Sequence, residues 1–269
     1  LTVGEHAYAA ERVVTTSAGK GAQILRDAGI EVETGVCEAE CREINEVFFH
    51  YITHKTPFVV LKYAMTLDGK IAAHTGDSRW VTGEAARRHV HETRNRLSGI
   101  MVGVGTVLAD DPLLTCRIDG GRNPVRIVCD SHARTPLGSQ LVQTANEIPT
   151  YVAVTARSER TAALEEKGVR ILVCGETDGH VDLTDLMQQL GSAGINGILL
   201  EGGSSLAFSA LKAGIVRRVQ AYIAPKLIGG ADAKSPVGGE GLAKMADALA
   251  LKNVRSTPLG EDFLIEGRL

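Results

Sequence analysis

The spacing of apolar positions along the chain switches repeatedly between two patterns. Short apolar runs bounded by turn residues predict buried strands, and stretches with apolar residues three and four positions apart predict helices. Gly168, Gly194 and Gly214 follow three of the helical stretches, and glycine favours the end of a helix. The expected strands are 58–65, 99–104, 125–130, 151–154, 169–173, 197–200 and 219–224, and the expected helices are 84–96, 159–167, 183–193 and 205–213.

Short apolar strands that alternate with helices indicate a largely parallel sheet covered on both faces. The end of the chain differs, because residues 252–259 and 262–267 have the pattern of a β-hairpin. The predicted fold class is therefore α/β, with a mostly parallel central sheet flanked by helices and an antiparallel C-terminal hairpin.

A break in the helical pattern at residues 54–57, which ends in Pro57, predicts a boundary near the N-terminus. We therefore expect a short region, residues 1–52, and a domain, residues 53–269. The elements expected before the boundary are a strand at 12–14, a helix at 21–28, a strand at 30–33 and a helix at 37–51.

Composition narrows the class of protein. A chain of 269 residues with 44% hydrophobic content can bury a substantial core and does not have the composition of a disordered protein. A net charge of −3 gives no electrostatic reason to expect nucleic acid as a partner. No apolar run approaches the ~20 residues that a membrane helix needs, and the first residues lack the pattern of a signal peptide. We expect a cytoplasmic protein.

Two pairs of residues have spacings that resemble metal sites. Cys37 and Cys41 lie four positions apart without a second pair, so two ordinary thiols are the better interpretation. His89 and His91 are two positions apart on a predicted helix, where side chains do not face each other, so a solvated face is favoured. We expect neither a metal nor a disulfide framework.

Unusual residues stand where predicted strands end, which is where open α/β sheets bind their ligands. Lys62 interrupts an apolar strand, either as an edge residue that reaches water or as a charge placed in a cleft, and the first case is the more common. The sequence V-G-V-G-T at 102–106 lets a flat group approach the backbone. It leads into a stretch that we expect to be a loop with Asp110, Asp111 and Arg117, although acidic pairs in loops are more often turn formers than catalysts.

The sequence E-G-G-S-S-L at 201–206 places a carboxylate and two glycines between a strand and a helix. The glycines permit close approach, and the free N–H groups at the start of the helix suit a phosphate or pyrophosphate. The stretch matches neither the P-loop nor the G-x-G-x-x-G pattern. From these residues alone, a turn without a ligand is equally compatible.

Five separated motifs stand in one order along the chain, namely K-Y-A-M-T-L-D-G-K-I-A, T-G-D-S-R-W-V-T, V-G-V-G-T-V-L-A-D-D-P-L-L-T-C-R, E-G-G-S-S-L and A-P-K-L-I-G-G. Together they resemble the reductase half of the bifunctional riboflavin-biosynthesis deaminase–reductase, from about Lys20 to the C-terminus. The resemblance implies a dihydrofolate-reductase-like fold and NADPH as the cofactor. It also implies reduction of 5-amino-6-(5-phosphoribosylamino)uracil to 5-amino-6-(5-phosphoribitylamino)uracil by hydride transfer to ribose C1′.

The same resemblance implies roles for individual residues. Contacts to NADPH are expected from Ala64, Trp80, Thr106, Asp110, Ser131 and the segment from Gly203 through Ser204, Ser205 and Leu206 to Ser209. Contacts to the substrate are expected from Ser78, Arg94, Leu114, Arg117 and Glu201, with the two arginines suited to its 5′-phosphate. The candidates for polarising the substrate imine and supplying a proton are Lys62, Asp110 and Glu201. The candidates for reading the 2′-phosphate of NADPH are Ser131, Arg134 and Arg157.

The zinc motifs of the deaminase half, His-x-Glu and Pro-Cys-x-x-Cys, do not occur in the chain. We therefore expect no deaminase activity, with residues 1–52 as the remnant of the C-terminal part of a deaminase domain plus a linker helix and residues 53–269 as the reductase domain. A homodimer is expected from the family and from the apolar segment A-Y-I-A-P-K-L-I-G-G. The alternatives are a related enzyme acting on another pterin or pyrimidine, such as dihydrofolate, and a non-catalytic module that binds NADPH.

Overall fold

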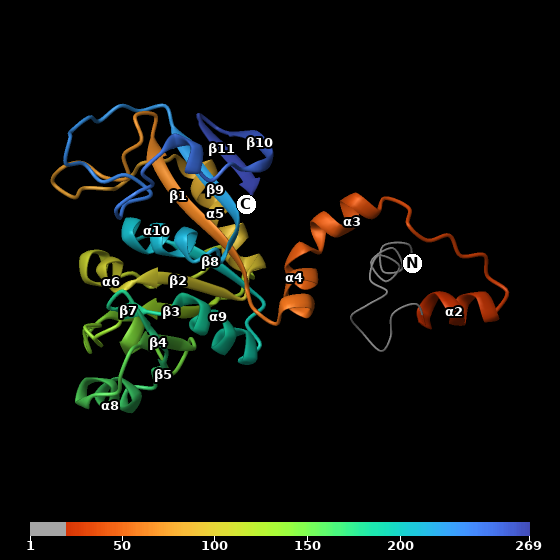
Figure 1. The fold of residues 1–269 in the computed structure, drawn as a ribbon, viewed down its shortest axis with the longest axis horizontal. Coiled ribbons are helices and arrows are strands. Elements are labelled where there is room, and N and C mark those ends of the chain that lie inside the picture. The colour runs from red at the N-terminus through yellow and green to blue at the C-terminus, as the bar shows by residue number, and fades with distance from the viewer. Residues whose placement is uncertain (1–19) are drawn as a thin grey trace.

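The computed structural model describes residues 20–269, which form one large sheet with helices on both faces (Figure 1). The sheet has nine strands in the order β10-β11-β9-β1-β8-β2-β3-β4-β5. The strands are β1 (Phe58–Thr66), β2 (Gly99–Gly103), β3 (Val125–Cys129), β4 (Thr150–Val154), β5 (Arg170–Val173), β8 (Gly197–Glu201), β9 (Val216–Ala224), β10 (Lys252–Leu259) and β11 (Asp262–Arg268).

The neighbouring strands from β9 to β5 pair in parallel, whereas β11 pairs antiparallel with both β9 and β10. The predicted fold class, including the C-terminal hairpin, is confirmed. Strand β1 lies inside the sheet, between β8 and β9, so Lys62 is not on an edge strand. Its register places Lys62 beside Glu201 of β8.

The helices are α2 (Lys20–Asp27), α3 (Glu38–Ile44), α4 (Glu46–His54), α5 (Glu84–Arg96), α6 (Val104–Asp110), α7 (Gln140–Gln143), α8 (Glu159–Glu166), α9 (Leu183–Ser192) and α10 (Ser204–Lys212), with a short 3₁₀ turn at Met245–Asp247. Five of them were expected within a residue or two, and α5 matches its predicted bounds. The separate hairpin of β6 (Glu176–Thr177) and β7 (His180–Val181) was not expected, nor was α7, because elements this short leave no periodic pattern.

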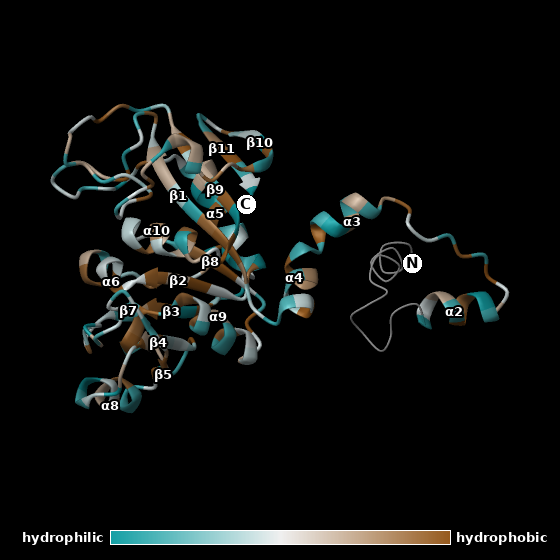
Figure 2. Cartoon of the chain, viewed as in Figure 1, coloured by the Kyte–Doolittle hydropathy of each residue, from teal (hydrophilic) through white to brown (hydrophobic). Residues whose placement is uncertain are grey.

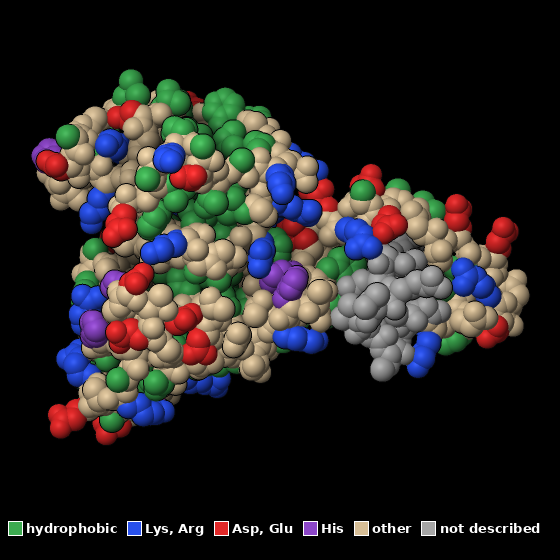
Figure 3. Space-filling model, viewed as in Figure 1, with side chains coloured by type: hydrophobic (Ala, Val, Ile, Leu, Met, Phe, Trp, Pro, Cys, Tyr) green, Lys and Arg blue, Asp and Glu red, His purple; other side chains and the backbone are tan. Residues whose placement is uncertain are grey.

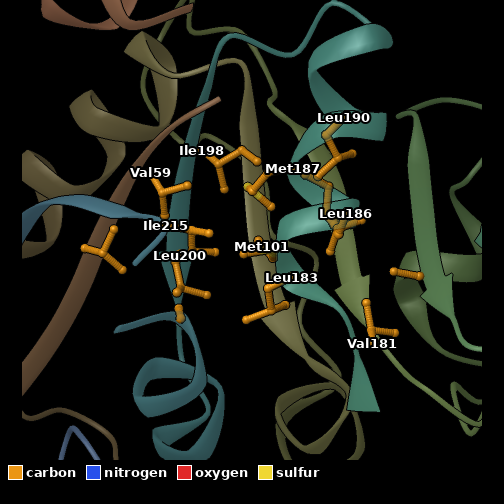
Figure 4. Packing of buried hydrophobic residues seen from close by; sticks show 14 of the residues in the cluster. Val59, Met101, Val181, Leu183, Leu186, Met187, Leu190, Ile198, Leu200 and Ile215 are labelled. Atoms are coloured by element: carbon orange, nitrogen blue, oxygen red, sulfur yellow. The ribbon is translucent and has the colours of Figure 1, made fainter. Parts of the chain in front are cut away.

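The core follows the alternation of side chains along the strands. On one face, Val59, Met101, Ile198 and Leu200 pack against α9 and α10 (Figure 4). On the other face, the residues between them pack against α6, α7 and α8 around Val107, Leu141 and Leu164, or against the end of α5 around Leu97. Figure 2 shows the central strands as the most hydrophobic part of the fold, as a sheet covered on both faces requires. Figure 3 shows cationic and anionic side chains interspersed on the visible face.

Three expectations in the N-terminal and β2 regions are wrong. Residues 30–33 form no strand, because no described segment pairs with them and Ile30 is 52% exposed. The expected helix at 37–51 is divided between α3 and α4 at Asn45, whose side-chain Nδ2 donates to the carbonyl of Cys41 (3.0 Å) and so competes with the helical backbone. Residues 104–110 form α6 rather than a strand end and loop, because Val104 and Val107 turn one face into the core. The strand expected at 12–14 lies outside the described residues.

Helices α3 and α4 form ion pairs with arginines of β9, β10 and β11. The carboxylate of Glu43 accepts two hydrogen bonds from Arg255 (2.6 and 2.8 Å). Glu46 lies 3.0 Å from Arg218 and 2.8 Å from Arg268. Helix α2 lies farther out, away from the sheet (Figure 1). Ion pairs to the sheet and the packing of Val47 against the core together attach α3 and α4.

Gly191 allows the turn after α4 to pack on α9. A Cβ atom at this position would overlap the carbonyl oxygen of Lys55, and the Gly191 carbonyl accepts a hydrogen bond from Tyr51 (2.9 Å). We expect Gly191→Ala to lower the free energy of unfolding by about 1–3 kcal/mol, as overpacking does, measured by urea denaturation. Gly21→Ala is the matched control, because Gly21 is also helical and has no heavy atom within 4 Å of the added Cβ. Equal midpoints for the two variants would contradict this packing.

Candidate active site

Glu201, the last residue of β8, is a buried carboxylate held between two cations. Arg94 of α5 donates from Nε to Oε1 (2.7 Å) and from Nη2 to Oε2 (3.0 Å). Lys62 Nζ lies 3.6 Å from Oε2. Val60 and Leu199, two residues earlier on the same strands, pack against Leu97, so strand alternation directs Lys62 and Glu201 to the face that α5 covers.

The charge of Glu201 is fixed by its partners. Burial alone would raise the pKa of Glu201, but the charges of Arg94 and Lys62 and the hydrogen bonds from Arg94 outweigh burial and hold its pKa at about 2. Burial would likewise lower the pKa of Arg94, and Glu201 reverses that effect so that the pKa is raised. At neutral pH Glu201 is therefore an ionised acceptor of hydrogen bonds and carries no proton to donate.

A cleft of about 840 Å³ opens beside this cluster at the carboxyl ends of the parallel strands. Most residues expected from the sequence to contact cofactor or substrate line it, namely Lys62, Ala64, Ser78, Trp80, Arg94, Thr106, Asp110, Leu114, Arg117, Ser131, Glu201, Gly203, Ser204, Ser205 and Leu206. Phe208 of the expected NADPH segment and Arg157, a candidate for the 2′-phosphate, are not part of the lining. Ligands of open α/β sheets bind at this position. Segments far apart in the sequence thus meet at one place.

The glycines of E-G-G-S-S-L form one wall of the cleft. Gly202 and Gly203 have φ values of 78° and 80°, which glycine adopts far more readily than other residues. A Cβ at Gly202 would lie 3.0 Å from Thr106 Oγ1, so the approach of α6 also requires glycine there. Gly203 precedes α10 and supplies no side-chain cap, which leaves the first N–H groups of the helix for another partner. This wall suits an anionic group such as a phosphate.

The two arginines expected at the substrate phosphate have different partners. Arg94 is engaged by Glu201 and also donates from Nη1 to the carbonyl of Thr115 (2.9 Å). Arg117 lies beside His91, with its backbone nitrogen 3.2 Å from Nδ1 and its Nε 3.3 Å from Nε2. Among residues 20–269, Arg117 forms no ion pair within 4.0 Å with a carboxylate.

The expectation that both histidines of α5 face solvent is wrong. His89 Nδ1 lies 2.8 Å from the hydroxyl of Tyr222, and His91 lines the cleft. Helix α5 is covered by the sheet on one side and by the loop that carries Arg117 on another. His89 therefore contacts Tyr222 of the sheet, whereas His91 contacts Arg117 of the loop. Sequence reasoning missed His91 as a site residue, because Arg117 is 26 positions away from it.

The residues expected at the 2′-phosphate of the cofactor are separated by the structure. Ser131 and Arg134 line the cleft. Arg157 is absent from the cleft lining, and its Nη1 instead donates to both carboxylate oxygens of Glu165 (3.0 and 2.8 Å). Arg134 is the cation of this group that the fold places within reach of a ligand.

The loop that carries Leu114 and Arg117 is supported from below by a buried arginine. Arg126 of β3 has no exposed surface, and it donates to the carbonyl of Leu113 (3.4 Å) and to Thr150 Oγ1 (2.9 Å) among other acceptors. Burial lowers the pKa of Arg126 to about 10, so it remains charged at neutral pH.

Asp110, expected in the loop that carries Arg117, instead ends α6 and faces the cleft from that helix.

Two loops that cover the cleft are tied to each other. The carboxylate of Asp68, after β1, accepts a hydrogen bond from the backbone of Gly229, after β9 (2.7 Å). Lys226 donates to the carbonyl of Trp80 (2.9 Å), and Trp80 and Ser78 reach the cleft from the loop after β1.

In the part of the chain that the structure describes, no group of three or more His, Cys, Asp or Glu residues could hold a metal, and no helix is long and apolar enough to cross a membrane.

This fold and site define an α/β protein with a ligand cleft at the ends of parallel strands, the arrangement of many nucleotide-binding enzymes. The sequence profile of the RibD C-terminal domain matches residues 57–265. The chain belongs to this family.

The chain covers some of its relatives almost completely and others only in part. The riboflavin biosynthesis protein RibD of Actinobacillus pleuropneumoniae is 52% identical over 250 residues, covering 93% of this chain and 66% of the relative. The 2,5-diamino-6-ribosylamino-4(3H)-pyrimidinone 5′-phosphate reductase of Methanothermobacter thermautotrophicus is 47% identical over 215 residues, covering 78% of this chain and 97% of the relative. The chain thus spans about two thirds of the length of the first and nearly all of the second.

Solved structures agree. The Thermotoga maritima diaminohydroxyphosphoribosylaminopyrimidine deaminase/5-amino-6-(5-phosphoribosylamino)uracil reductase superposes with a TM-score of 0.76 at 34% identity, covering 93% of this chain and 67% of that one. Acinetobacter baumannii RibD gives a TM-score of 0.79 at 32% identity, covering 94% and 69%.

The Glu201 cluster predicts a dependence of stability on pH. Because the pKa of Glu201 falls from 4.5 to about 2 on folding, its contribution is complete above pH 4.5 and is lost as the pH falls toward 2. We expect Glu201→Gln to lower the free energy of unfolding at pH 7 by about 3 kcal/mol, since it leaves buried cations unpaired, and the difference from the wild type to shrink below pH 4.5. Glu165→Gln, which breaks the exposed pair with Arg157, should change it by less than about 1 kcal/mol. Similar losses in both variants, measured by urea unfolding across pH, would contradict this account.

Proposed function

We propose that this chain is an NADPH-dependent reductase of riboflavin biosynthesis that converts 5-amino-6-(5-phosphoribosylamino)uracil into 5-amino-6-(5-phosphoribitylamino)uracil. The observation that carries the proposal is the gathering of residues from separated motifs around one cleft, in a chain that belongs to the RibD C-terminal domain family. A relative of known structure bears the name of this reductase.

The cleft fits the proposed cofactor. NADPH carries a pyrophosphate, and the wall formed by Gly202, Gly203 and the start of α10 offers close approach and free N–H groups to an anion. Arg134 at the cleft adds a cation for the 2′-phosphate. When bound, NADPH supplies the hydride of the reaction.

The residues of the chain supply the polar chemistry. Lys62 presents an ammonium group to the cleft, 17% exposed and held by Glu201, where it can donate a proton to the open imine form of the substrate. Glu201, ionised and fixed by Arg94, orients Lys62 and accepts hydrogen bonds from the substrate. Asp110 faces the same cleft from α6, and Arg117 offers its charge to the 5′-phosphate.

A second substrate is favoured by one comparison. The Methanothermobacter reductase, 47% identical and almost fully covered, is named for 2,5-diamino-6-ribosylamino-4(3H)-pyrimidinone 5′-phosphate. Its pyrimidine carries an amino group at C2, where the uracil compound carries an oxygen. Both substrates have the same phosphorylated ribose, so the Lys62, Glu201 and Arg117 arrangement serves either.

The remaining expectations stay predictions. Residues 53–269 are proposed as the reductase domain, and the family match begins at residue 57. Residues 1–52 are proposed to correspond to the last part of a deaminase domain and a linker helix. A homodimer and a cytoplasmic location complete the proposal. Sedimentation equilibrium at a single monomer mass would contradict the dimer.

The activity is tested by following NADPH absorbance with purified protein and each of three substrates. We expect oxidation with one or both phosphorylated pyrimidines and none with dihydrofolate, because dihydrofolate lacks the phosphorylated ribose whose C1′ would accept the hydride. Oxidation with dihydrofolate alone would replace the proposal by the alternative enzyme. Binding of NADPH without oxidation in any mixture would favour a non-catalytic module.

The glycine wall predicts which substitution removes the cofactor. Gly203→Val places a branched side chain at a φ of 80° beside the start of α10, so we expect at least a tenfold (~1.4 kcal/mol) loss of NADPH affinity by fluorescence titration. Gly214→Val is the matched control, with a φ of 65° after the same helix and no neighbour within 4 Å. It should carry similar backbone strain and keep NADPH affinity. Unchanged affinity in Gly203→Val would place the pyrophosphate elsewhere.

A further inference from the structure

Two of the arginines that line the cleft, Arg94 and Arg117, have partners of different charge. Arg94 meets the carboxylate of Glu201 at 2.7 and 3.0 Å, so its charge is compensated inside the protein. Arg117 meets the imidazole of His91 at 3.2 and 3.3 Å and, within residues 20–269, no carboxylate within 4.0 Å. The protein thus restrains Arg117 without neutralising it.

We propose that His91 is a positioning residue that aims the Arg117 guanidinium at a phosphate in the cleft while leaving its positive charge free for that phosphate. This inference rests on the proposed function and adds a residue that the family motifs do not mark. A neutral imidazole accepts at one nitrogen only, so the proposed role uses the tautomer with hydrogen on Nδ1, in which Nε2 accepts from Arg117 Nε (3.3 Å). The Arg117 backbone nitrogen, 3.2 Å from Nδ1, is then a contact and not a second hydrogen bond. The outer nitrogens of Arg117 then remain available for phosphate oxygens.

The surroundings keep His91 neutral. Burial, followed by the charges of Arg94 and Arg117, lowers the pKa of His91 to about 4, against a smaller opposing effect of Glu201. The ring also stands on α5, where the Sγ atom of Cys116 contacts the His91 carbonyl (3.4 Å) and brings the Arg117 loop against the helix. A cationic side chain at position 91 would be repelled by Arg94 and Arg117. A carboxylate at this position would pair with Arg117 in place of the phosphate of the ligand.

Two substitutions of matched shape at His91 distinguish the positioning of Arg117 from the neutralisation of its charge. His91→Gln keeps a neutral oxygen acceptor near the place of Nε2, whereas His91→Glu puts a charged acceptor there. We expect His91→Gln to change the KM for the phosphorylated substrate by less than about threefold and His91→Glu to raise it by about tenfold or more, the effect of losing a charge-assisted contact. His91→Ala, which frees Arg117 to move, should fall between them. The KM for the dephosphorylated substrate should be the same in all four proteins.

A double-mutant cycle tests whether His91 acts through Arg117. In the Arg117→Ala background, His91→Glu should cause no further rise in KM, and Arg117→Ala alone should leave NADPH affinity unchanged. Equal effects of His91→Gln and His91→Glu, or effects that simply add to Arg117→Ala, would overturn the proposal. NADPH affinity reports on folding of the cleft, so its loss in a variant would mark that variant as structurally damaged.

The test does not depend on turnover. Ribose 5-phosphate binding by calorimetry probes the same contact if the wild-type protein oxidises no NADPH with either pyrimidine, which would contradict the proposed function alone. We then expect binding to the wild type and to His91→Gln, and binding at least about tenfold weaker to His91→Glu. No binding to the wild type, or the same binding to all variants, would reject the role of His91.

Discussion

The constraint on which this structure depends is the burial of one carboxylate, Glu201, at the end of an interior strand. An unpaired charge at that depth would cost several kcal/mol, so it is stable only with Arg94 and Lys62 beside it. Glu201 comes from β8, Lys62 from β1 and Arg94 from α5, and the ion pairs therefore join three elements at the cleft. The same contacts fix which side chains face a ligand and in which charge state.

Within residues 20–269, the cations around the cleft fall into two groups, those paired with a carboxylate of the protein and those without one. Glu201 compensates the cations that the fold itself requires, and Arg117 is left with a neutral partner and an uncompensated charge. A chain of net charge −3 thereby places a local cationic group and the N-terminus of a helix at one cleft, an arrangement that suits an anionic ligand. Buried Arg126 contributes indirectly, since it satisfies backbone carbonyls beneath the Arg117 loop.

Much of the fold followed from the pattern of the sequence. The runs at β1, β2 and β8 are apolar on both faces, and α5 has clear helical spacing, so these elements were predictable to within one or two residues. The errors lie where one local contact decides. The Asn45 side chain shares the Cys41 carbonyl with its own backbone N–H where α3 gives way to α4. Residues 30–33 lack a strand partner, and neither fact leaves a periodic signature.

The sequence by itself determined the alternation of strands and helices, the residues at the strand ends and the glycines that shape the wall of the cleft, because these depend on local backbone preference and side-chain period. Only the tertiary structure decided that Arg94 pairs with Glu201 and that His91 lies beside Arg117. These pairs are separated by 107 and 26 positions, and their partners are chosen by strand order and helix packing, which no local pattern encodes. The charge state of Glu201 is likewise a property of the folded arrangement, since it depends on burial and on two cations brought in from other elements.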